Sequence, residues 1–359
     1  MAPAVRLELL TCRQEEVDWG TEELEKIFDR VHWISIDAFR PRKFGAVCAT
    51  LPQFDLIDLQ YHQSGALIDT VRRIWPQAAV VYSPMESLIR ASVVSIRNLW
   101  GATGLFRARP VQWKKWVGQI WNATQEARYI RKADRVICVS ETDQKALAWI
   151  GRPDRLYCVP TGLSPLEFSK DPERAFSLQD SQADSVQSIV FVAYFGSQTN
   201  REALIWYCNN VHSKLRQLVR NYELQVVGRG LDEDLIKCCK GEGIHFVGAV
   251  NFIGDALSKA SIGIAPALSG GGVRGKIHQY AAAALPCVAS RIAWEGMAYQ
   301  PCSSILVADS EQEFLEKCLL LLRNPSLGRR IGRKANEICM QNYAWSSMGK
   351  QIAAAYKLD

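Results

Sequence analysis

The stretch that decides the fold is Ile262-Gly-Ile-Ala-Pro-Ala-Leu-Ser-Gly-Gly-Gly-Val-Arg-Gly-Lys-Ile-His-Gln-Tyr-Ala-Ala-Ala-Ala-Leu-Pro-Cys-Val-Ala-Ser290. It begins with a short apolar run and passes through a run of glycines into an alanine-rich segment of helix length. A second apolar run ends it. This order of strand, glycine turn, helix and strand predicts an α/β protein in which helices connect parallel strands.

The glycine turn in this stretch has the features of an anion-binding site. Gly270, Gly271 and Gly272 let the backbone adopt positive φ and approach a ligand closely. The amides at the start of the following helix favour anions, and Arg274 and Lys276 add two positive charges. The alternative is a flexible surface loop with solvated cations. Because three glycines carry an entropic cost that a plain connection avoids, we expect the turn to bind a diphosphate.

Short β-branched runs alternate with segments of helix length throughout the rest of the chain. In the first half, strands are expected over 5–11, 32–36, 56–59, 79–82, 135–139 and 156–159. In the second half, strands are expected over 188–193, 223–227, 245–247, 262–265, 286–289 and 304–307. Residues 164–187, rich in Ser, Asp, Glu and Gln, are interpreted as a linker.

This arrangement predicts two Rossmann-like domains, residues 1–163 and residues 164–342. The chain after Pro325 is predicted to form two helices separated near Asn342. The last helix, about residues 343–359, is expected to pack back on the first domain. Two such sheets facing each other enclose a cleft at the carboxyl ends of their strands, where ligands bind in open α/β sheets.

Composition narrows the class of protein. The chain has 359 residues, is 48% hydrophobic and carries a formal net charge of +6, which is too small for a typical nucleic-acid-binding domain. Its longest apolar runs fall short of the roughly twenty residues of a membrane-spanning helix, and the amino terminus lacks the apolar core of a secretory signal. The 11 cysteines are scattered without metal-like pairing. We therefore expect buried thiols in a cytoplasmic protein.

Several segments together resemble one protein family. They are Ala133-Asp-Arg-Val-Ile-Cys-Val-Ser140, Val159-Pro-Thr-Gly162, Phe191-Val-Ala-Tyr-Phe-Gly196, Leu224-Gln-Val-Val-Gly-Arg-Gly230, Phe246-Val-Gly-Ala-Val250 and Glu295-Gly296, besides the glycine turn. In these segments the chain resembles the retaining, nucleotide-sugar-dependent glycosyltransferases of family 4. The resemblance covers roughly residues 134–356. It implies the GT-B fold, in which two facing Rossmann-like domains bind an acceptor and a nucleotide-sugar donor respectively.

The resemblance also implies roles for individual residues. The donor diphosphate is expected to bind Lys276 and the turn formed by Gly270, Gly271, Gly272, Val273 and Arg274. The opposite wall of the donor site would consist of Gly196, Ser197 and Asn200. The base would meet the backbone near Val250, and Arg229 would lie close to the nucleotide.

The sequence departs from the family pattern at two places. The family usually has two glutamates eight positions apart, at the positions occupied here by Gly271 and Gln279. Gln279 can still exchange hydrogen bonds with ribose hydroxyls. The cation pair common after the first strand of the second domain is also missing, because Ser197 to Thr199 supplies none. Arg274 and Lys276 would then provide most of the positive charge.

Retaining enzymes of this family need no protein nucleophile, because the departing phosphate takes the acceptor proton while the cations stabilise it. The histidines of the sequence also lack metal-ligand spacing. No metal site and no cofactor are therefore expected. His62 and Glu86 follow predicted strands and could position or deprotonate an acceptor hydroxyl. The alternative is that both are hydrogen-bonded polar groups at strand ends. Asp232 and Asp234 are interpreted as acids in the first turn of a helix rather than as metal ligands.

A basic segment from Arg90 to Trp121 is interleaved with tryptophans. It could dock on an anionic membrane surface, at the inner face of the membrane, to reach a lipid-linked acceptor. It could instead bind a polyanionic or protein acceptor. The third interpretation is a pair of core helices with buried tryptophans and solvated cations.

The sequence as a whole predicts a metal-independent hexosyltransferase of glycan biosynthesis. The expected donor is a UDP- or GDP-sugar, the expected acceptor is a hydroxyl of a glycan, lipid-linked molecule or protein, and no nucleic acid is expected to bind. Two alternatives remain at this point. One is a binding or scaffold protein of the same fold without activity, which the two absent glutamates motivate. The other is a nucleotide-sugar epimerase.

Overall fold

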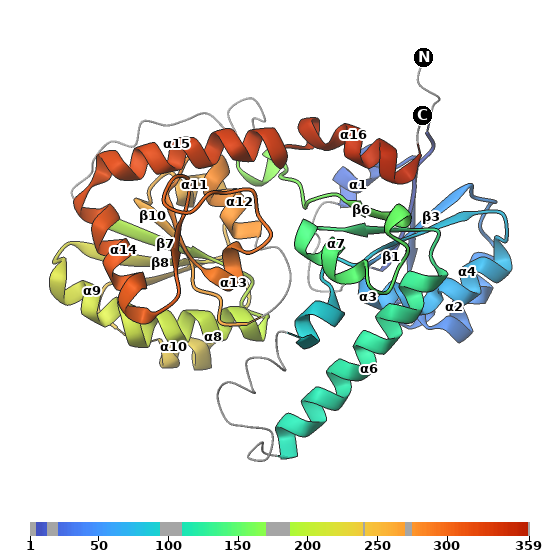
Figure 1. Ribbon diagram of the computed structural model, residues 1–359, viewed down its shortest axis with the longest axis horizontal. Helices are drawn as coiled ribbons and strands as arrows, with labels where there is room; N and C mark the ends of the chain where they lie inside the picture. Colours follow the sequence, from blue (N-terminus) through green and yellow to red (C-terminus); the bar gives the residue numbers. More distant parts are fainter. Residues whose placement is uncertain are drawn as a thin grey trace.

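The computed structural model describes residues 5–12, 21–93, 110–169, 187–239, 241–269 and 275–357. The chain forms two lobes, each built around a parallel sheet (Figure 1). The first lobe contains β1 to β6 and the second contains β7 to β12. They are called here the first and the second domain. The glycine turn, residues 270–274, and most of the predicted linker lie outside the described residues.

The second domain contains a six-stranded parallel sheet with the strand order β12-β11-β10-β7-β8-β9. Its strands are β7 (Gln187–Val192), β8 (Tyr222–Val227), β9 (Ile244–Gly248), β10 (Ile262–Ala265), β11 (Cys287–Ser290) and β12 (Leu306–Ala308). Counted within the domain, this is the Rossmann order 3-2-1-4-5-6. The chain winds outward from β7 in one direction and from β10 in the other, so these two neighbouring strands mark the switch point of the sheet.

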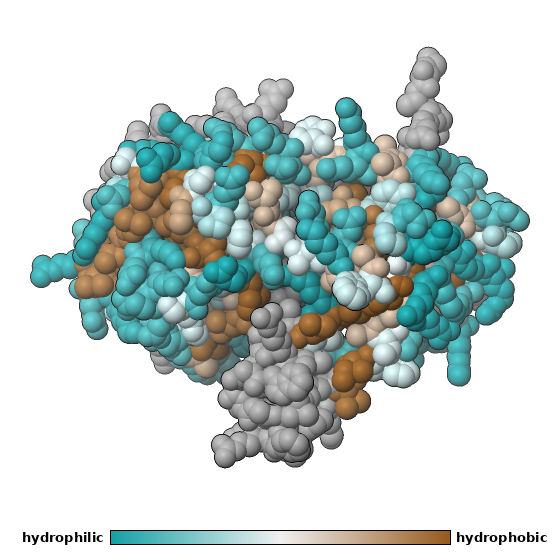
Figure 2. All heavy atoms as spheres, viewed as in Figure 1, coloured by the Kyte–Doolittle hydropathy of each residue, from teal (hydrophilic) through white to brown (hydrophobic). Residues whose placement is uncertain are grey.

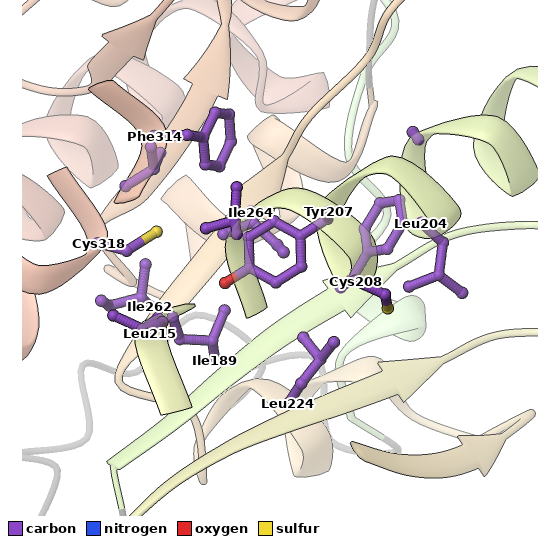
Figure 3. Close-up of a cluster of buried hydrophobic side chains, with 14 of the residues drawn as sticks. Ile189, Leu204, Tyr207, Cys208, Leu215, Leu224, Ile262, Ile264, Phe314 and Cys318 are labelled. Atoms are coloured by element: carbon purple, nitrogen blue, oxygen red, sulfur yellow. The ribbon is translucent and has the colours of Figure 1, made fainter. Parts of the chain in front are cut away.

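Helices cover both faces of this sheet, because its strands carry apolar side chains on both sides. One face is covered by α8 (Gln198–Tyr207), the π-helical turn η6 (Cys208–His212), α9 (Ser213–Leu218) and α14 (Glu311–Arg323). Figure 3 shows the core on this side, where Tyr207 and Phe314 meet sheet residues such as Ile264. The other face is covered by α11 (Ile253–Leu257), α12 (Gly275–Ala282) and α15 (Pro325–Asn342). The short helices α10 (Glu233–Cys238) and α13 (Arg291–Trp294) complete the domain.

The first domain has a smaller parallel sheet with the order β3-β4-β5-β6. Its strands are β3 (Leu56–Gln60), β4 (Ala79–Ser83), β5 (Arg135–Cys138) and β6 (Leu156–Cys158), and β1 (Glu8–Cys12) pairs separately with β2 (Arg30–Ile34). The helical segments are α1 (Thr21–Ile27), η1 (Ile36–Phe39), α2 (Pro41–Cys48), α3 (Tyr61–Ser64), η2 (Gly65–Leu67), α4 (Ile68–Ile74), α6 (Pro110–Lys132), α7 (Glu141–Leu147), η4 (Pro153–Arg155) and η5 (Pro165–Glu167). Residues 88–93 are also helical.

The end of the chain connects the two domains. Helix α15 runs along the second domain, and α16 (Trp345–Tyr356) continues onto the first (Figure 1). Ala355 is fully buried against Val81 and Ile137 of the first sheet. The hydroxyl of Tyr356 donates to Asp58 Oδ2 at 2.8 Å. The last helix therefore supplies part of the core of the domain that the first half of the chain builds.

All 11 cysteines are free thiols, and most of them are buried. Burial raises the pKa of Cys318 to about 12 and that of Cys339 to about 11. Among the helices that the structure describes, none is long and apolar enough to cross a bilayer.

Candidate functional site

The candidate site lies at the switch point between β7 and β10. In an open parallel sheet, the loops after two strands whose connections run in opposite directions separate and leave a crevice. Here a small pocket at the carboxyl ends of these strands is lined by residues that include Phe191, Asn200 and Lys276. The fold thus brings together side chains that are far apart in the sequence, at a place where such sheets bind ligands.

The Lys276 side chain is held in place by residues on the β7 side of the pocket. Its ammonium donates to Asn200 Oδ1 at 3.0 Å and lies 4.4 Å from the centre of the Phe191 ring. The Asn200 amide in turn donates to the backbone oxygen of Tyr194 at 2.9 Å. Because Lys276 is the second residue of α12, its charge adds to the positive end of that helix. The arrangement fixes a cation where an anion would enter the crevice.

The opposite wall of this pocket is formed by the start of α8, which follows the turn after β7. Ser197 is the residue before α8, and its hydroxyl lies 2.9 Å from the Thr199 hydroxyl. A Cβ atom at Gly196 would approach the Tyr194 ring to 2.3 Å, so a larger residue there would require this exposed ring to shift. Gly196 and Ser197 thus lie in the turn that leads into α8, and of the three predicted residues Asn200 is the one that contacts Lys276. Thr199 belongs to the same wall and was not predicted.

Five predicted ligands of the diphosphate lie outside the described residues. They are Gly270, Gly271, Gly272, Val273 and Arg274. The described chain resumes at Gly275, where α12 begins, so the turn leads directly into the helix that carries Lys276. The predicted role of these residues remains an expectation.

Gln279 contacts a carboxylate that the sequence did not indicate. It follows Lys276 by three residues on α12, and its amide nitrogen donates to Glu167 Oε2 at 3.0 Å. Glu167 ends η5, where the chain leaves the first domain. An acidic side chain thus lies beside Gln279, at one of the two positions where the family pattern has a glutamate. The two residues are 112 positions apart, so no local pattern could have predicted the contact.

Two further predicted residues lie toward the neighbouring strands. Arg229 is exposed and follows β8, and its backbone oxygen accepts from Phe195 N at 2.7 Å. Val250 is half-buried and packs against the core next to α11 and α12. Both lie on the side of β8 and β9 rather than in the pocket around Lys276.

The predicted residues of the first domain follow its strands as expected. His62 is the second residue of α3, which follows β3. Its Nδ1 lies 3.5 Å from the Tyr82 hydroxyl. Burial lowers the pKa of His62 below its ordinary value of 6.5, which favours the neutral imidazole. Tyr61, directly before it, is exposed and has a φ of 64°. A positive φ is costly for a residue with a large side chain and is often found at functional positions.

An ion-pair network joins the two domains near Glu86. Arg90 contacts Asp143 at 3.2 Å within the first domain and Glu295 at 2.6 Å in the second. Burial raises the pKa of Asp143, and the nearby charge of Glu86 adds to this effect. Gly296, with a φ of 84°, turns the chain against Ser140 and Thr142. The network fixes the loop after β11 against the start of α7, on the side where the strands of both sheets end.

Glu126 is a fully buried carboxylate in the carboxyl-terminal half of α6. Its Oε2 accepts from the backbone N–H of Ile89 at 2.8 Å, whereas its Oε1 has no partner among the described residues. Burial raises the pKa of Glu126 to about 7. Glu126 therefore fixes the segment before Arg90 through this hydrogen bond. Burial disfavours its ionised form, because the charge is poorly solvated there.

Replacing Glu126 with glutamine is expected to reduce the dependence of stability on pH. In the folded protein the pKa of Glu126 is about 7, above its ordinary value of 4.5. The contribution of Glu126 to the free energy of unfolding is therefore fully present below pH 4.5 and is lost as the pH rises through 7. The difference is roughly 3 kcal/mol. Urea unfolding of both proteins across this range should show a smaller decrease for Glu126→Gln. Equal decreases in the two proteins would contradict the assignment.

The acidic cluster at Asp232 has a structural role. Asp232 caps α10 by accepting from Leu235 N at 2.8 Å, and both of its oxygens accept from Arg201, at 2.6 and 3.0 Å. Arg201 holds the pKa of Asp232 at about 2. The interpretation as a helix-start acid is therefore confirmed. Among the residues that the structure describes, no group of three or more His, Cys, Asp or Glu side chains could hold a metal ion.

Comparison with known proteins agrees with this geometry. HepE of Anabaena, solved with UDP and glucose, superimposes with a TM-score of 0.70 and 14% identity over 98% of this chain and 100% of that chain. Sucrose-phosphate synthase of Thermosynechococcus elongatus gives 0.67 and 16% over 91% and 80%. A Listeria monocytogenes protein assigned as a UDP-N-acetylglucosamine 2-epimerase gives 0.56 and 12% over 98% and 96%. No curated protein matches the sequence.

The two parallel α/β domains and their arrangement define the GT-B fold, which confirms the predicted fold class. Within it, residues 186–324 match the family model of group 1 glycosyl transferases. The matched region begins just before β7 and ends after α14, so it includes both sides of the Lys276 pocket.

Proposed function

We propose that this protein is a glycosyltransferase that transfers a hexose from a UDP- or GDP-sugar to a hydroxyl acceptor with retention of configuration. The observation that carries the proposal is the Lys276 ammonium fixed by Asn200 at the switch point, beside the amino end of α12. The family model over residues 186–324 supports the activity. The UDP and glucose bound to HepE support the donor class.

The chemistry follows from the charges of the site. When the bond between sugar and diphosphate breaks, negative charge develops on the departing phosphate. A fixed ammonium stabilises that charge, and it does so more strongly in a pocket from which water is excluded. Arg274 and the amides of the glycine turn would bind the same diphosphate. The proposed reaction requires neither a metal nor a cofactor, and the departing phosphate accepts the proton of the acceptor hydroxyl.

On the acceptor side, the proposal assigns His62 and Glu86 to the orientation of the hydroxyl. Burial favours the neutral form of His62, which can accept a hydrogen bond from an alcohol. Glu167 is proposed to take part in ribose binding together with Gln279, because a carboxylate held in place by an amide is a strong acceptor for hydroxyl groups.

The experiment that tests the function is a titration followed by product analysis. Calorimetry with UDP and GDP should show binding of one of them. Incubation with UDP- and GDP-hexoses and a panel of hydroxyl acceptors should release that nucleotide and form an α-linked product from an α-linked donor. The same yield in the presence of EDTA is expected. Folded protein that binds neither nucleotide would favour a scaffold, for which the glycine and glutamine in place of two glutamates argue.

A nucleotide-sugar epimerase is the second candidate, favoured by the similarity to the Listeria protein. An epimerase would convert the sugar of the donor without any acceptor. Chromatography of the nucleotide sugar after incubation alone separates the two activities. An epimerised nucleotide sugar would overturn the transferase proposal, whereas unchanged donor together with a glycosylated acceptor would exclude the epimerase.

A further inference from the structure

A cavity in the first domain lies at the amino ends of β5 and β6, and we call it the β5–β6 cavity. Its volume is about 210 Å³, against about 10 Å³ for the pocket around Lys276. The end of α6, the start of β5 and the segment from Ile150 to Leu156 line it. The β5–β6 cavity is therefore at the edge of the sheet away from His62 and Glu86, which follow the carboxyl ends of β3 and β4.

The floor of the β5–β6 cavity is apolar. Ile130, Val136 and Leu156 line it and belong to the core of the first domain, and Ile150 is half-buried beside them. By contrast, the surface of this domain is largely hydrophilic on the face that Figure 2 shows. An apolar floor that can be reached from solvent favours the apolar part of a ligand over water.

Three arginines and no acidic residue line the same cavity: Arg131, Arg152 and Arg155. Arg152 pairs with Asp154 at 3.4 Å, but both side chains are more than 60% exposed, so this pair is weak. Within the described part of the chain, neither the Arg131 nor the Arg155 guanidinium has a hydrogen-bond or ion-pair partner. The lining therefore carries at least two positive charges that no neighbouring carboxylate pairs with.

Asp134, which follows the lining residue Ala133, is already paired on another side. Its Oδ2 accepts from Val80 N at 2.8 Å and lies 3.0 Å from the Arg72 guanidinium. Burial raises the pKa of Asp134, whereas the Val80 N–H, Arg72 and, least of these, Arg155 lower it. Arg155 thus acts on this carboxyl at a distance and remains able to bind an anion.

The charge and the size of the cavity indicate the class of ligand. A guanidinium can bind a phosphate through two parallel hydrogen bonds, and a phosphate monoester carries about −1.5 to −2 at pH 7, which matches two unpaired arginines. Inorganic phosphate alone would leave the apolar floor in contact with water. The volume is also below the roughly 300–1,000 Å³ of pockets for drug-sized ligands, so the apolar part is compact.

We propose that the β5–β6 cavity binds a small phosphate monoester with a compact apolar substituent, such as an aryl phosphate. Arg131 and Arg155 bind the phosphate, and the substituent lies on Ile130, Val136 and Leu156. Because the cavity is at the amino ends of the strands, this ligand is neither the donor nor the acceptor of the proposed reaction. The inference therefore goes beyond the proposed function and does not depend on it.

The proposal is tested by calorimetric titration of the full chain with three probes. Phenyl phosphate has both parts of the ligand, methyl phosphate lacks the ring, and phenol lacks the phosphate. Phenyl phosphate should bind at least about tenfold more tightly than either of the others, since only it uses the apolar floor and the arginines together. Absence of heat with phenyl phosphate at millimolar concentrations, or equal affinity for methyl phosphate, would overturn the proposal. This comparison uses only the parent protein.

A double variant locates the probe in the cavity. Arg131→Gln combined with Arg155→Gln should bind phenyl phosphate at least about tenfold more weakly, since it loses two charge-assisted contacts. It should keep the parent's unfolding temperature, because neither side chain has a partner among the described residues. The matched control is Arg42→Gln combined with Arg73→Gln, which removes two exposed arginines of the same domain outside the cavity. Unchanged affinity in the first variant, or an equal loss in both, contradicts the assignment.

A last variant excludes the donor site as the place where the probe binds. Phenyl phosphate should bind Lys276→Ala as tightly as it binds the parent, because Lys276 lies in the second domain. Weaker binding to this variant would place the probe in the pocket around Lys276 and overturn the proposal. Failure of the protein to bind UDP or GDP, in contrast, would contradict the proposed function and leave the result for phenyl phosphate unaffected.

Discussion

Replacing Lys276 with alanine is expected to lower the rate of sugar transfer by about a hundredfold or more, since removal of one fixed donor from a charge-stabilising site typically has such an effect. The ammonium is held by Asn200 at 3.0 Å and lies above the Phe191 ring. It is therefore in position before the donor binds, and no reorganisation is needed as charge develops. The measurement is kcat/KM for the nucleotide sugar, together with the Kd of the free nucleotide.

Two further variants separate catalysis from stability. Lys276→Met keeps the aliphatic stem over Phe191 and removes only the charge, so it should be as inactive as Lys276→Ala and closer to the parent in stability. Lys259→Ala removes an exposed cation that precedes β10, at the amino ends of the strands and so on the side of the sheet away from the pocket. This variant should leave transfer unchanged. Parent-like transfer by Lys276→Met would contradict the assignment of Lys276 to the diphosphate.

The strands were predictable because each is a short apolar run between polar segments. All twelve expected strands occur, and each boundary lies within three residues of the predicted one. The expectation for 262–265 coincides with β10, which is buried along its whole length. The largest shift is at the amino terminus, where β1 covers Glu8–Cys12 instead of 5–11. Strand β1 pairs only with β2, so burial restricts the position of its ends less than it does in the central strands.

The meeting of Lys276 and Asn200 was predictable in outline, because both follow strands that become neighbours once the Rossmann order is assumed. Contacts that depend on the packing of the two domains against each other could not be predicted. Gln279 and Glu167 are 112 residues apart, and Arg90 and Glu295 are 205 residues apart. Their contacts depend on how the two domains meet, which no periodicity of the sequence records.

The surface of α6 was ambiguous for a different reason. An apolar stripe at helical spacing has the same sequence pattern whether it faces a core or another partner. Only the exposed fractions of Val117, Ile120 and Trp121 separate the two possibilities. Glu126 shows the converse case, since a charged residue in the same helix is fully buried. Burial therefore argues against the core interpretation for these three side chains, and it does not choose between a membrane and a polyanionic or protein acceptor.

Replacing Gly228 with alanine is expected to destabilise the second domain by more than about 3 kcal/mol, because a strained backbone conformation and a clash with rigid backbone add together. Gly228 has a φ of 138°, and a Cβ atom there would lie 1.7 Å from the backbone oxygen of Ala193. That segment cannot move away easily, since Ala193 N donates to Val227 O at 3.0 Å and Gly228 N donates to Gly248 O at 2.7 Å. The clash therefore falls where β7, β8 and β9 are joined, beside the turn that carries Asn200.

The measurement is urea unfolding of the parent and of Gly228→Ala, with Gly349→Ala as the matched control. Gly349 is exposed within α16, and a Cβ atom there would meet nothing within 4 Å. The control should be neutral or more stable by up to about 1 kcal/mol, since alanine is favoured over glycine inside a helix. A Gly228→Ala protein that unfolds at the parent's urea midpoint would show that Ala193 and Gly228 are not packed backbone to backbone. The rigid turn that we propose as one wall of the donor site would then not exist.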